Sequence, residues 1–304
     1  MVTLFQFLKR KVIQVSCLIV FCFISCLFNS KIAYAHPTVS NEFEQGIVQM
    51  QQGHYQKALQ NFTEAIEQGK QIDAAYSNRC VVWLSLEQYQ HADQDCTLAI
   101  QHKTNNPTVY INRGLALYRL GQYQKAITDF TTAIQLDHEA YLAYYNRGLA
   151  YTALGQPLQA IADYDQATQQ MDHATQDQLS IVYNDRGLAY LNLGNFTTAM
   201  LNFNQAIQLD DHNSLALYNR GCACSRNKNY QQAIADFSAV LKHNPRHGEA
   251  YINRGMIHQR LGSLQAALDD FRLGIQYLPH QDHQVYKMIQ KLRKVLSEFD
   301  TTIG

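Results

Sequence analysis

Charge is scarce in this chain of 304 residues, because only 16% of them are Asp, Glu, Lys or Arg and the formal net charge is +0. Disordered chains combine high charge with little apolar material, whereas hydrophobic residues make up 46% here. The chain should therefore fold around a sizeable core.

The sequence also lacks the short motifs of several enzyme classes. It contains no HExxH, no phosphate-binding P-loop, no GxSxG and no dinucleotide fingerprint. His280 and His283 are spaced H-x-x-H, and His243 and His247 flank a proline, but neither pair has a carboxylate or thiolate at matching spacing. We therefore expect no enzyme, metal site, cofactor or small-molecule substrate.

Long apolar runs are absent except near the N-terminus, where three basic residues precede the mostly apolar residues 12–28. Ala33, Tyr34 and Ala35 then form an A-x-A site, so residues 1–35 are expected to be a secretory signal peptide cleaved near Ala35. The alternatives are a membrane anchor formed by residues 12–28, which are barely long enough to span a bilayer, and lipidation at Cys26. We expect a secreted, periplasmic or envelope protein.

Cleavage at that site removes four positive charges and leaves a mature chain with a net charge of about −4. Nucleic acid and anionic lipid both require clustered Lys and Arg, so neither is expected as a partner. The oligomeric state does not follow from the sequence.

A fixed period organises the rest of the chain. An aromatic or apolar residue lies three residues before an alanine seven times, and the spacings are 34, 34, 34, 39, 34 and 34 residues. Such a period is typical of stacked repeats, here residues 39–279 in seven repeats that start near 39, 73, 107, 141, 180, 214 and 248. Five extra residues around 171–178 predict a longer loop or an extended helix.

Small and bulky residues recur at set places, counted as positions from each repeat start. Position 20 is alanine in all seven repeats, position 8 is glycine except for Cys80, and position 24 is aromatic except for Cys96. Position 15 is usually a glycine that can end a helix; Lys228 replaces it in repeat six, where neighbouring asparagines should tolerate the turn. Each repeat should be two closely packed helices.

These columns resemble the tetratricopeptide repeat family. Tyr145-Asn146-Arg147-Gly148 further resembles a Tyr-Asn-Arg-Gly subtype common in bacterial, especially cyanobacterial, proteins. The resemblance implies an all-α, right-handed α-solenoid of helix-turn-helix repeats. Residues 280–304 should add a capping helix and tail, because apolar residues recur on one side of residues 282–299.

Cysteine is too sparse for a disulfide framework, since only four remain after residue 35. Cys222 and Cys224 lie on different sides of a helix and cannot pair with each other. Cys80 and Cys96 occupy core columns, so we expect buried small side chains there, with a disulfide as the alternative.

Arginine at position 7 and an acidic residue at position 23 occur together. Both are missing from repeat one, and repeat five has Arg186 with Asn202. We expect partly buried pairs that join the two helices and fix their geometry, with an anion-binding role as the alternative. The pairs are Arg79 with Asp95, Arg113 with Asp129, Arg147 with Asp163, Arg220 with Asp236 and Arg254 with Asp270.

The resemblance further implies a concave surface formed by the first helices. Side-chain amides recur there at position 6 and could hydrogen-bond the main chain of an extended peptide. The expected groove comprises Asn78, Asn112, Asn146, Asp185, Asn219 and Asn253 at position 6, Ile111, Tyr145, Tyr218 and Ile252 at position 5, and Arg119, Arg226 and Arg260 at position 13.

The sequence therefore favours a non-enzymatic scaffold or assembly factor that holds a protein or peptide in this groove. Two alternatives stay open: a positioning or regulatory subunit of an envelope enzyme complex, and a structural envelope component.

Overall fold

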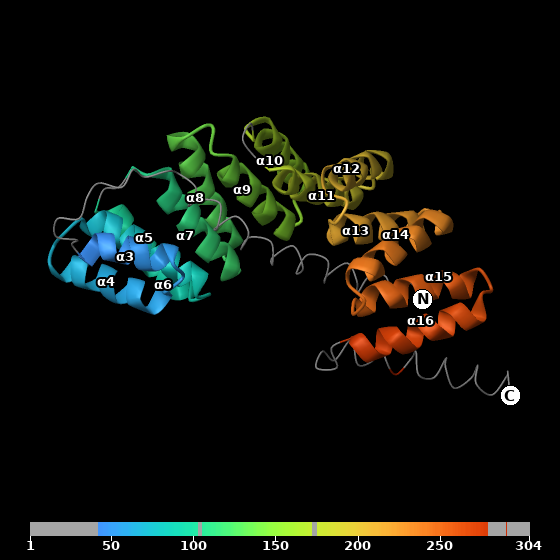
Figure 1. The fold of residues 1–304 in the computed structure, drawn as a ribbon. Helices are drawn as coiled ribbons and strands as arrows, with labels where there is room; N and C mark the ends of the chain where they lie inside the picture. Colours follow the sequence, from blue (N-terminus) through green and yellow to red (C-terminus); the bar gives the residue numbers. More distant parts are fainter. Residues whose placement is uncertain (1–41, 103–104, 172–174, 279–289, 291–304) are drawn as a thin grey trace. The chain divides into compact units, whose positions relative to one another are not determined.

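The computed structural model describes residues 42–102, 105–171 and 175–278, together with Gln290 (Figure 1). The expected signal peptide lies outside these residues, and so does the expected C-terminal helix except for Gln290. Within them the chain forms fourteen helices and no strand, so the all-helical fold predicted from the repeat is confirmed.

The helices follow one another as seven pairs. The first helices are α3 Glu42–Gln51, α5 Ile72–Ser85, α7 Pro107–Arg119, α9 Tyr141–Ala153, α11 Gln176–Asn192, α13 Ser214–Arg226 and α15 Gly248–Arg260. The second helices are α4 Tyr55–Glu67, α6 Tyr89–Gln101, α8 Tyr123–Leu136, α10 Pro157–Gln169, α12 Phe196–Leu209, α14 Tyr230–His243 and α16 Leu264–Tyr277. Each first helix packs on the second helix that follows it.

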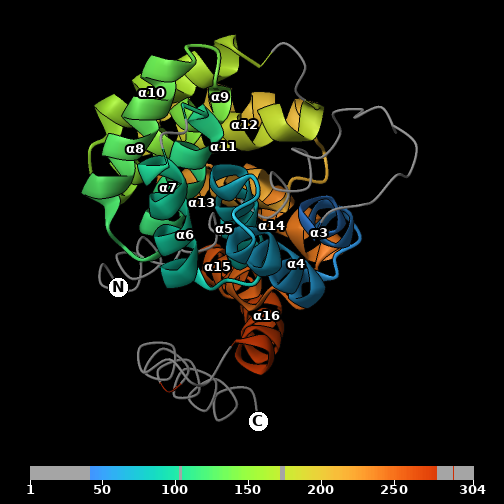
Figure 2. The same cartoon turned by 90° about the vertical axis from the view of Figure 1, so that its left-hand side faces the viewer.

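The pairs belong to two compact modules. The N-terminal module, within residues 6–172, holds α3 to α10, and the C-terminal module, within residues 173–304, holds α11 to α16. In the N-terminal module successive helices pack side by side in chain order, which Figures 1 and 2 show from two directions. The same order holds within the C-terminal module.

The five extra residues lengthen a helix. Helix α11 begins at Gln176, four residues before the repeat start at Ser180, and has 17 residues. The side chain of Thr175 accepts from the Gln178 amide while the Gln178 side chain accepts from the Thr175 amide. This capping box satisfies two donors that otherwise have no partner at a helix start.

The core depends on contact between glycine at position 8 and the ring at position 24. Phe130 is fully buried against Gly114, and a Cβ atom added to Gly114 would lie 2.6 Å from Cε1 of Phe130. The same close approach occurs between Gly148 and Tyr164. Any side chain at position 8 therefore excludes an aromatic ring at position 24.

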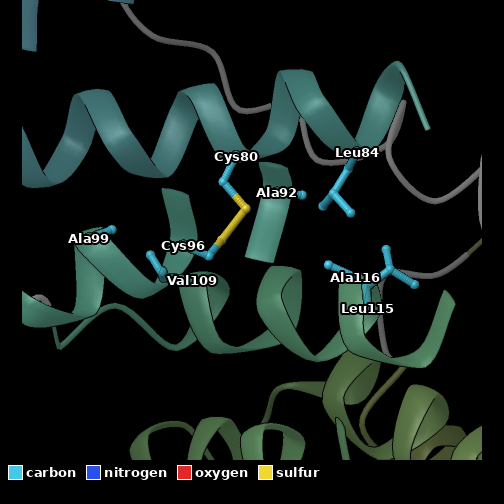
Figure 3. Close-up of a cluster of buried hydrophobic side chains, with 8 residues drawn as sticks. All are labelled: Cys80, Leu84, Ala92, Cys96, Ala99, Val109, Leu115 and Ala116. Atoms are coloured by element: carbon cyan, nitrogen blue, oxygen red, sulfur yellow. A yellow bond between two sulfur atoms is a disulfide. The ribbon is translucent and has the colours of Figure 1, made fainter. Parts of the chain in front are cut away.

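Repeat two breaks this rule by exchanging both residues. Cys80 and Cys96 form a disulfide, with their Cα atoms 5.5 Å apart and neither side chain exposed. The expectation that both are merely buried small side chains is wrong. The bond lies among the apolar side chains between α5, α6 and α7, as Figure 3 shows.

The turns inside the repeats require a residue with positive φ. Glycine supplies it at Gly53 and Gly121, but Glu87 (φ 58°) and Lys228 (φ 62°) adopt it in repeats two and six. In repeat six Lys228 itself, rather than a neighbouring asparagine, takes the left-handed conformation. Residues with a Cβ are strained there, which glycine is not.

We predict that Glu87→Gly raises the free energy of unfolding by about 0.5–1 kcal/mol, because it relieves this backbone strain. Urea unfolding followed by circular dichroism measures the change. Gly121→Ala at the equivalent turn serves as the reverse control and should lower stability. A loss of stability in Glu87→Gly would show that the Glu87 side chain matters more than its backbone conformation.

Candidate functional site

The first helices form a continuous layer within each module. Helices α3, α5, α7 and α9 contact one another in sequence, and so do α11, α13 and α15. On each first helix, positions 2, 6, 9 and 13 recur at helical spacing and share one face. In repeat three these are Thr108, Asn112, Leu115 and Arg119.

The position 6 side chains are less exposed than side chains that line an open binding groove would be. Asn112 is 4% exposed and Asn253 is 5% exposed; Asn146, Asp185 and Asn219 are also buried. Asn78 is half-buried. The structure therefore does not display these amides openly along the first helices.

Several of these amides already have partners inside the protein. Asn78 and Asn146 each donate from Nδ2 to the carbonyl one turn earlier, at 2.9 Å to Ala74 and 2.8 Å to Leu142. Such bonds satisfy a buried donor without any ligand.

In the C-terminal module the amides pair between helices. Asn219 donates to Oδ1 of Asn184 at 2.9 Å, and Asn184 donates to Asp185 at 3.0 Å. Asn253 donates to the hydroxyl of Tyr218 at 2.9 Å. These hydrogen bonds join α11, α13 and α15 to one another. The sequence analysis had instead expected the position 6 side chains to bind a partner.

Two buried amide atoms have no hydrogen-bond partner within the described part of the chain: Nδ2 of Asn112 and Oδ1 of Asn253. A buried donor or acceptor left unpaired costs roughly 1–3 kcal/mol. Asn112 therefore carries hydrogen-bonding capacity that the folded chain does not use.

The other expected groove residues divide by position. At position 5, Tyr145 and Ile252 are 2% and 1% exposed, and Ile111 and Tyr218 are also buried, so they serve as core residues. At position 13 the arginines lie nearer the surface. The Arg119 guanidinium lies 5.8 Å from the Tyr89 ring centroid, Arg260 donates to the Tyr230 hydroxyl at 3.4 Å, and Arg226 is exposed.

The arginines at position 7 each meet the residue 16 positions later. Arg147 donates from Nε and Nη2 to both oxygens of Asp163, at 2.8 and 2.7 Å. Arg186 makes one such bond, from Nε to Oδ1 of Asn202 at 2.7 Å. Both nitrogens likewise bind both carboxylate oxygens in the pairs Arg79–Asp95, Arg113–Asp129, Arg220–Asp236 and Arg254–Asp270.

Each of the five arginines that pair with an aspartate also donates a hydrogen bond to a side chain of the preceding repeat. The sequence analysis did not predict this contact. Nη1 of Arg147 donates to the hydroxyl of Thr131 at 3.0 Å, 16 residues earlier. The corresponding acceptors of the other four are Thr63, Thr97, Asn204 and Ser238. The signal available in the sequence was a Thr, Ser or Asn at position 25. One guanidinium therefore ties three helices together.

Burial and pairing both affect these charges. The hydrogen bond to Asp95 raises the pKa of Arg79, whereas burial raises the pKa of Asp163 despite its contact with Arg147. Removing a carboxylate from water is costly, so such pairs fix geometry more reliably than they add stability. The nitrogens of these arginines bind protein oxygens within the fold, which favours the structural role over the anion-binding alternative.

The two remaining cysteines of the C-terminal module are poor nucleophiles. Burial raises the pKa of Cys222 to about 12 and the pKa of Cys224 to about 11. Both stay as thiols near neutral pH, and only the thiolate reacts readily. The described residues contain no group of three or more His, Cys, Asp or Glu that could hold a metal ion.

His247 is the N-cap residue of helix α15 and is half-buried. Its Nδ1 accepts from the Ala250 amide at 3.2 Å, its ring stacks on Tyr218 with centroids 5.1 Å apart, and Glu249 lies 3.4 Å away. Burial lowers the pKa of His247 although the charge of Glu249 opposes that shift. The neutral ring is therefore the form that the fold favours.

We predict that acid destabilises the C-terminal module through His247. A pKa below the unfolded value of about 6.5 means that the unfolded chain binds the proton first, so stability falls as pH drops below about 6.5. Asn at this position keeps a capping acceptor but does not titrate. Urea unfolding between pH 8 and pH 5 should show a smaller loss in His247→Asn; equal losses would remove His247 as the cause.

None of the helices in the described part of the chain is both long and apolar enough to cross a bilayer.

Family models of repeats match several segments. A model described as TPR repeat matches residues 114–155, and models described as tetratricopeptide repeat match 141–170, 181–213, 214–247 and 248–279. Together they cover about half of the chain. A comparison with curated proteins found no match.

Solved structures resemble the fold at low sequence identity. A tetratricopeptide repeat protein from Parabacteroides merdae ATCC 43184 is 21% identical with a TM-score of 0.64, covering 83% of this chain and 96% of that one. PilW, described as a type IV pilus biogenesis factor, is 15% identical with a TM-score of 0.64, covering 72% and 99%.

A third similar structure is the APC/C hetero-tetramer Cut9–Hcn1. It is 14% identical with a TM-score of 0.63, and the match covers 82% of this chain and 48% of that one. At these identities the likeness shows the fold alone. With the matched repeat models and the seven helix pairs, it identifies the chain as a tetratricopeptide-repeat protein.

Proposed function

We propose that this chain is a non-enzymatic scaffold that holds a partner polypeptide against the layer of first helices. Tetratricopeptide proteins are generally non-catalytic and typically bind other proteins, and the fold accommodates such partners, as the Cut9–Hcn1 hetero-tetramer illustrates. The observation that carries the proposal is the unpaired Nδ2 donor of Asn112.

The surroundings of Asn112 favour a main-chain contact. Thr108 lies one turn before it on the same face of α7 and is half-exposed, as are Ala74 and Leu142 at the same position of the neighbouring repeats. Apolar and uncharged side chains around a spare amide donor suit a peptide carbonyl rather than a charged motif. The Asn112 side chain would turn outward to donate to it.

The other position 6 amides of the N-terminal module are less available as donors. Asn78 and Asn146 flank Asn112 in the N-terminal module, and each already donates to its own helix. We therefore narrow the proposed contact from a whole row of amides to the surface around Asn112 on α7.

We further propose that the protein acts outside the cytoplasm. The buried disulfide between Cys80 and Cys96 supports this, because such bonds persist in oxidising compartments and are rare in the cytosol. The basic and apolar pattern of residues 1–35 supports the same proposal.

Site-specific photo-cross-linking tests the contact surface. A photoreactive amino acid at Thr108 should cross-link a polypeptide in the cells that make the protein, and mass spectrometry would identify it. The matched control is the same probe at Leu158, which is 67% exposed on the second helix α10. Cross-linking from Leu158 but not from Thr108 would contradict the proposed surface.

A further inference from the structure

The Cys80–Cys96 disulfide occupies a place that a ring and a glycine fill elsewhere. In the other repeats, glycine at position 8 lies against an aromatic ring at position 24, and the nearest ring atom would be 2.6 to 3.0 Å from an added Cβ. Repeat two has the same two helices, α5 and α6, but neither the glycine nor the ring.

The two exchanges depend on each other. A Cβ at position 80 would collide with a ring at position 96, so Cys80 requires a small residue opposite. Cys96 without the ring would leave space between the helices unless the side chain of Cys80 helps to fill it. The bonded pair fills the space between the helices, whereas Cys80 alone would collide with a ring and Cys96 alone would leave a cavity.

The neighbouring side chains make the site sensitive to the state of the sulfur atoms. Both cysteines are 0% exposed, and they lie among Leu84, Val109 and Ala116 from α5 and α7 (Figure 3). Two unbonded sulfur atoms need more separation than two bonded ones, and a close-packed core tolerates added volume poorly. Reduction also removes a cross-link between residues 16 apart in the sequence.

We propose that repeat two is completed by an oxidation, so that the N-terminal module reaches its full stability only after the Cys80–Cys96 bond has formed. The two thiols lose two protons and two electrons to a small-molecule or protein disulfide, which becomes two thiols, and one S–S bond forms between α5 and α6. Thiol–disulfide exchange of this kind is available wherever secreted proteins fold. The disulfide is thus a covalent cross-link between α5 and α6 that forms after synthesis.

Burial should make the disulfide harder to reduce after folding than it was to form during folding. A reductant must reach a sulfur atom to attack it, and neither sulfur atom belongs to an exposed residue. Once formed, the bond should resist mild reductant until the α5–α6 pair opens. The chain would therefore respond to the redox state of the compartment while it folds and much less afterwards.

The experiment compares the purified full-length chain in two states. One sample keeps its disulfide; the other is unfolded and reduced, then refolded with a thiol reductant present. Thermal unfolding by circular dichroism should show a midpoint roughly 5–10 °C lower for the reduced sample. Hydrogen exchange should locate the loss in α5 and α6. Equal midpoints would overturn the proposal.

A consensus-restoring variant isolates the cause. Cys80→Gly with Cys96→Phe returns the glycine and ring found in the other repeats, and its midpoint should not change with reductant. Should it respond as strongly as the natural chain, the effect arises elsewhere and the proposal fails. Neither result depends on partner binding, so the proposed function is tested separately.

Peptide mapping of the protein isolated under thiol-blocking conditions gives a further check that needs no variant. It should recover Cys80 and Cys96 as one linked pair, with Cys222 and Cys224 as thiols. Recovery of Cys80 and Cys96 as free thiols would overturn the proposal.

Discussion

Replacing Arg147 by methionine should lower the free energy of unfolding by about 3–5 kcal/mol. The change removes both bonds to Asp163, whose side chain is only 6% exposed, and also the bond to Thr131 in the preceding repeat. A carboxylate is then left buried without a counter-charge, which costs more than the intact pair contributes. Urea unfolding measures the loss.

Two further variants separate charge from geometry. Arg147→Met with Asp163→Leu removes both charges and should recover much of the lost stability. Asp163→Asn imitates the Arg186–Asn202 pair of repeat five and should cost less than Arg147→Met, because an amide oxygen still accepts one bond. Unchanged stability in Arg147→Met together with lost partner binding would show that the arginine serves a ligand instead.

Truncating Phe130 to alanine should be of similar severity, at about 3–5 kcal/mol. The ring is 0% exposed and lies against the backbone of Gly114, so its removal leaves a cavity between α7 and α8. Leu158→Ala, at a side chain that is 67% exposed, is the matched control and should change stability by less than about 0.5 kcal/mol. Similar losses in both variants would contradict the packing described.

The partner of that contact gives a double-mutant cycle. Gly114→Ala alone should cost about 1–3 kcal/mol because its Cβ would crowd the Phe130 ring. With Phe130→Ala already present the same change should cost much less, since the ring is gone. Purely additive losses would show that the two residues do not press on each other.

The sequence predicted those features that repeat as columns. The helix pairs followed from the period, and the pairing of Arg113 with Asp129 followed from two columns that are lost together in repeat one. The third bond of each arginine, such as that from Arg113 to Thr97, was missed because it crosses to the preceding repeat. A search for polar residues 16 positions before the arginine could have found it.

Features that depend on how neighbouring repeats pack against one another could not be predicted from the repeating columns of the sequence. Helical spacing placed Asn112 and Asn146 on one face of their helices, but it did not show that both side chains are buried. Nor could it show that Asn146 donates to Leu142 while Asn112 stays unpaired. The number of cysteines alone did not indicate the disulfide; the informative signal was that Cys80 and Cys96 replace the glycine and the ring of the same repeat.

If a partner chain binds the unpaired donor of Asn112, Asn112→Leu should weaken partner binding without lowering the stability of the fold. Leucine at this position removes the unpaired donor, so stability should stay the same or rise, as happens when an unsatisfied buried group is replaced by an apolar one. The lost bond to the partner should weaken binding by roughly 2- to 12-fold. Asn146→Leu, whose amide is already paired, should instead lower stability.

The decisive measurement is the dissociation constant of the polypeptide cross-linked from Thr108, determined by titration against the natural chain and Asn112→Leu at equal folded fraction. The account predicts weaker binding by a variant that is at least as stable as the natural chain. Unchanged affinity accompanied by a loss of stability would contradict it, because Asn112 would then serve the fold and not a partner.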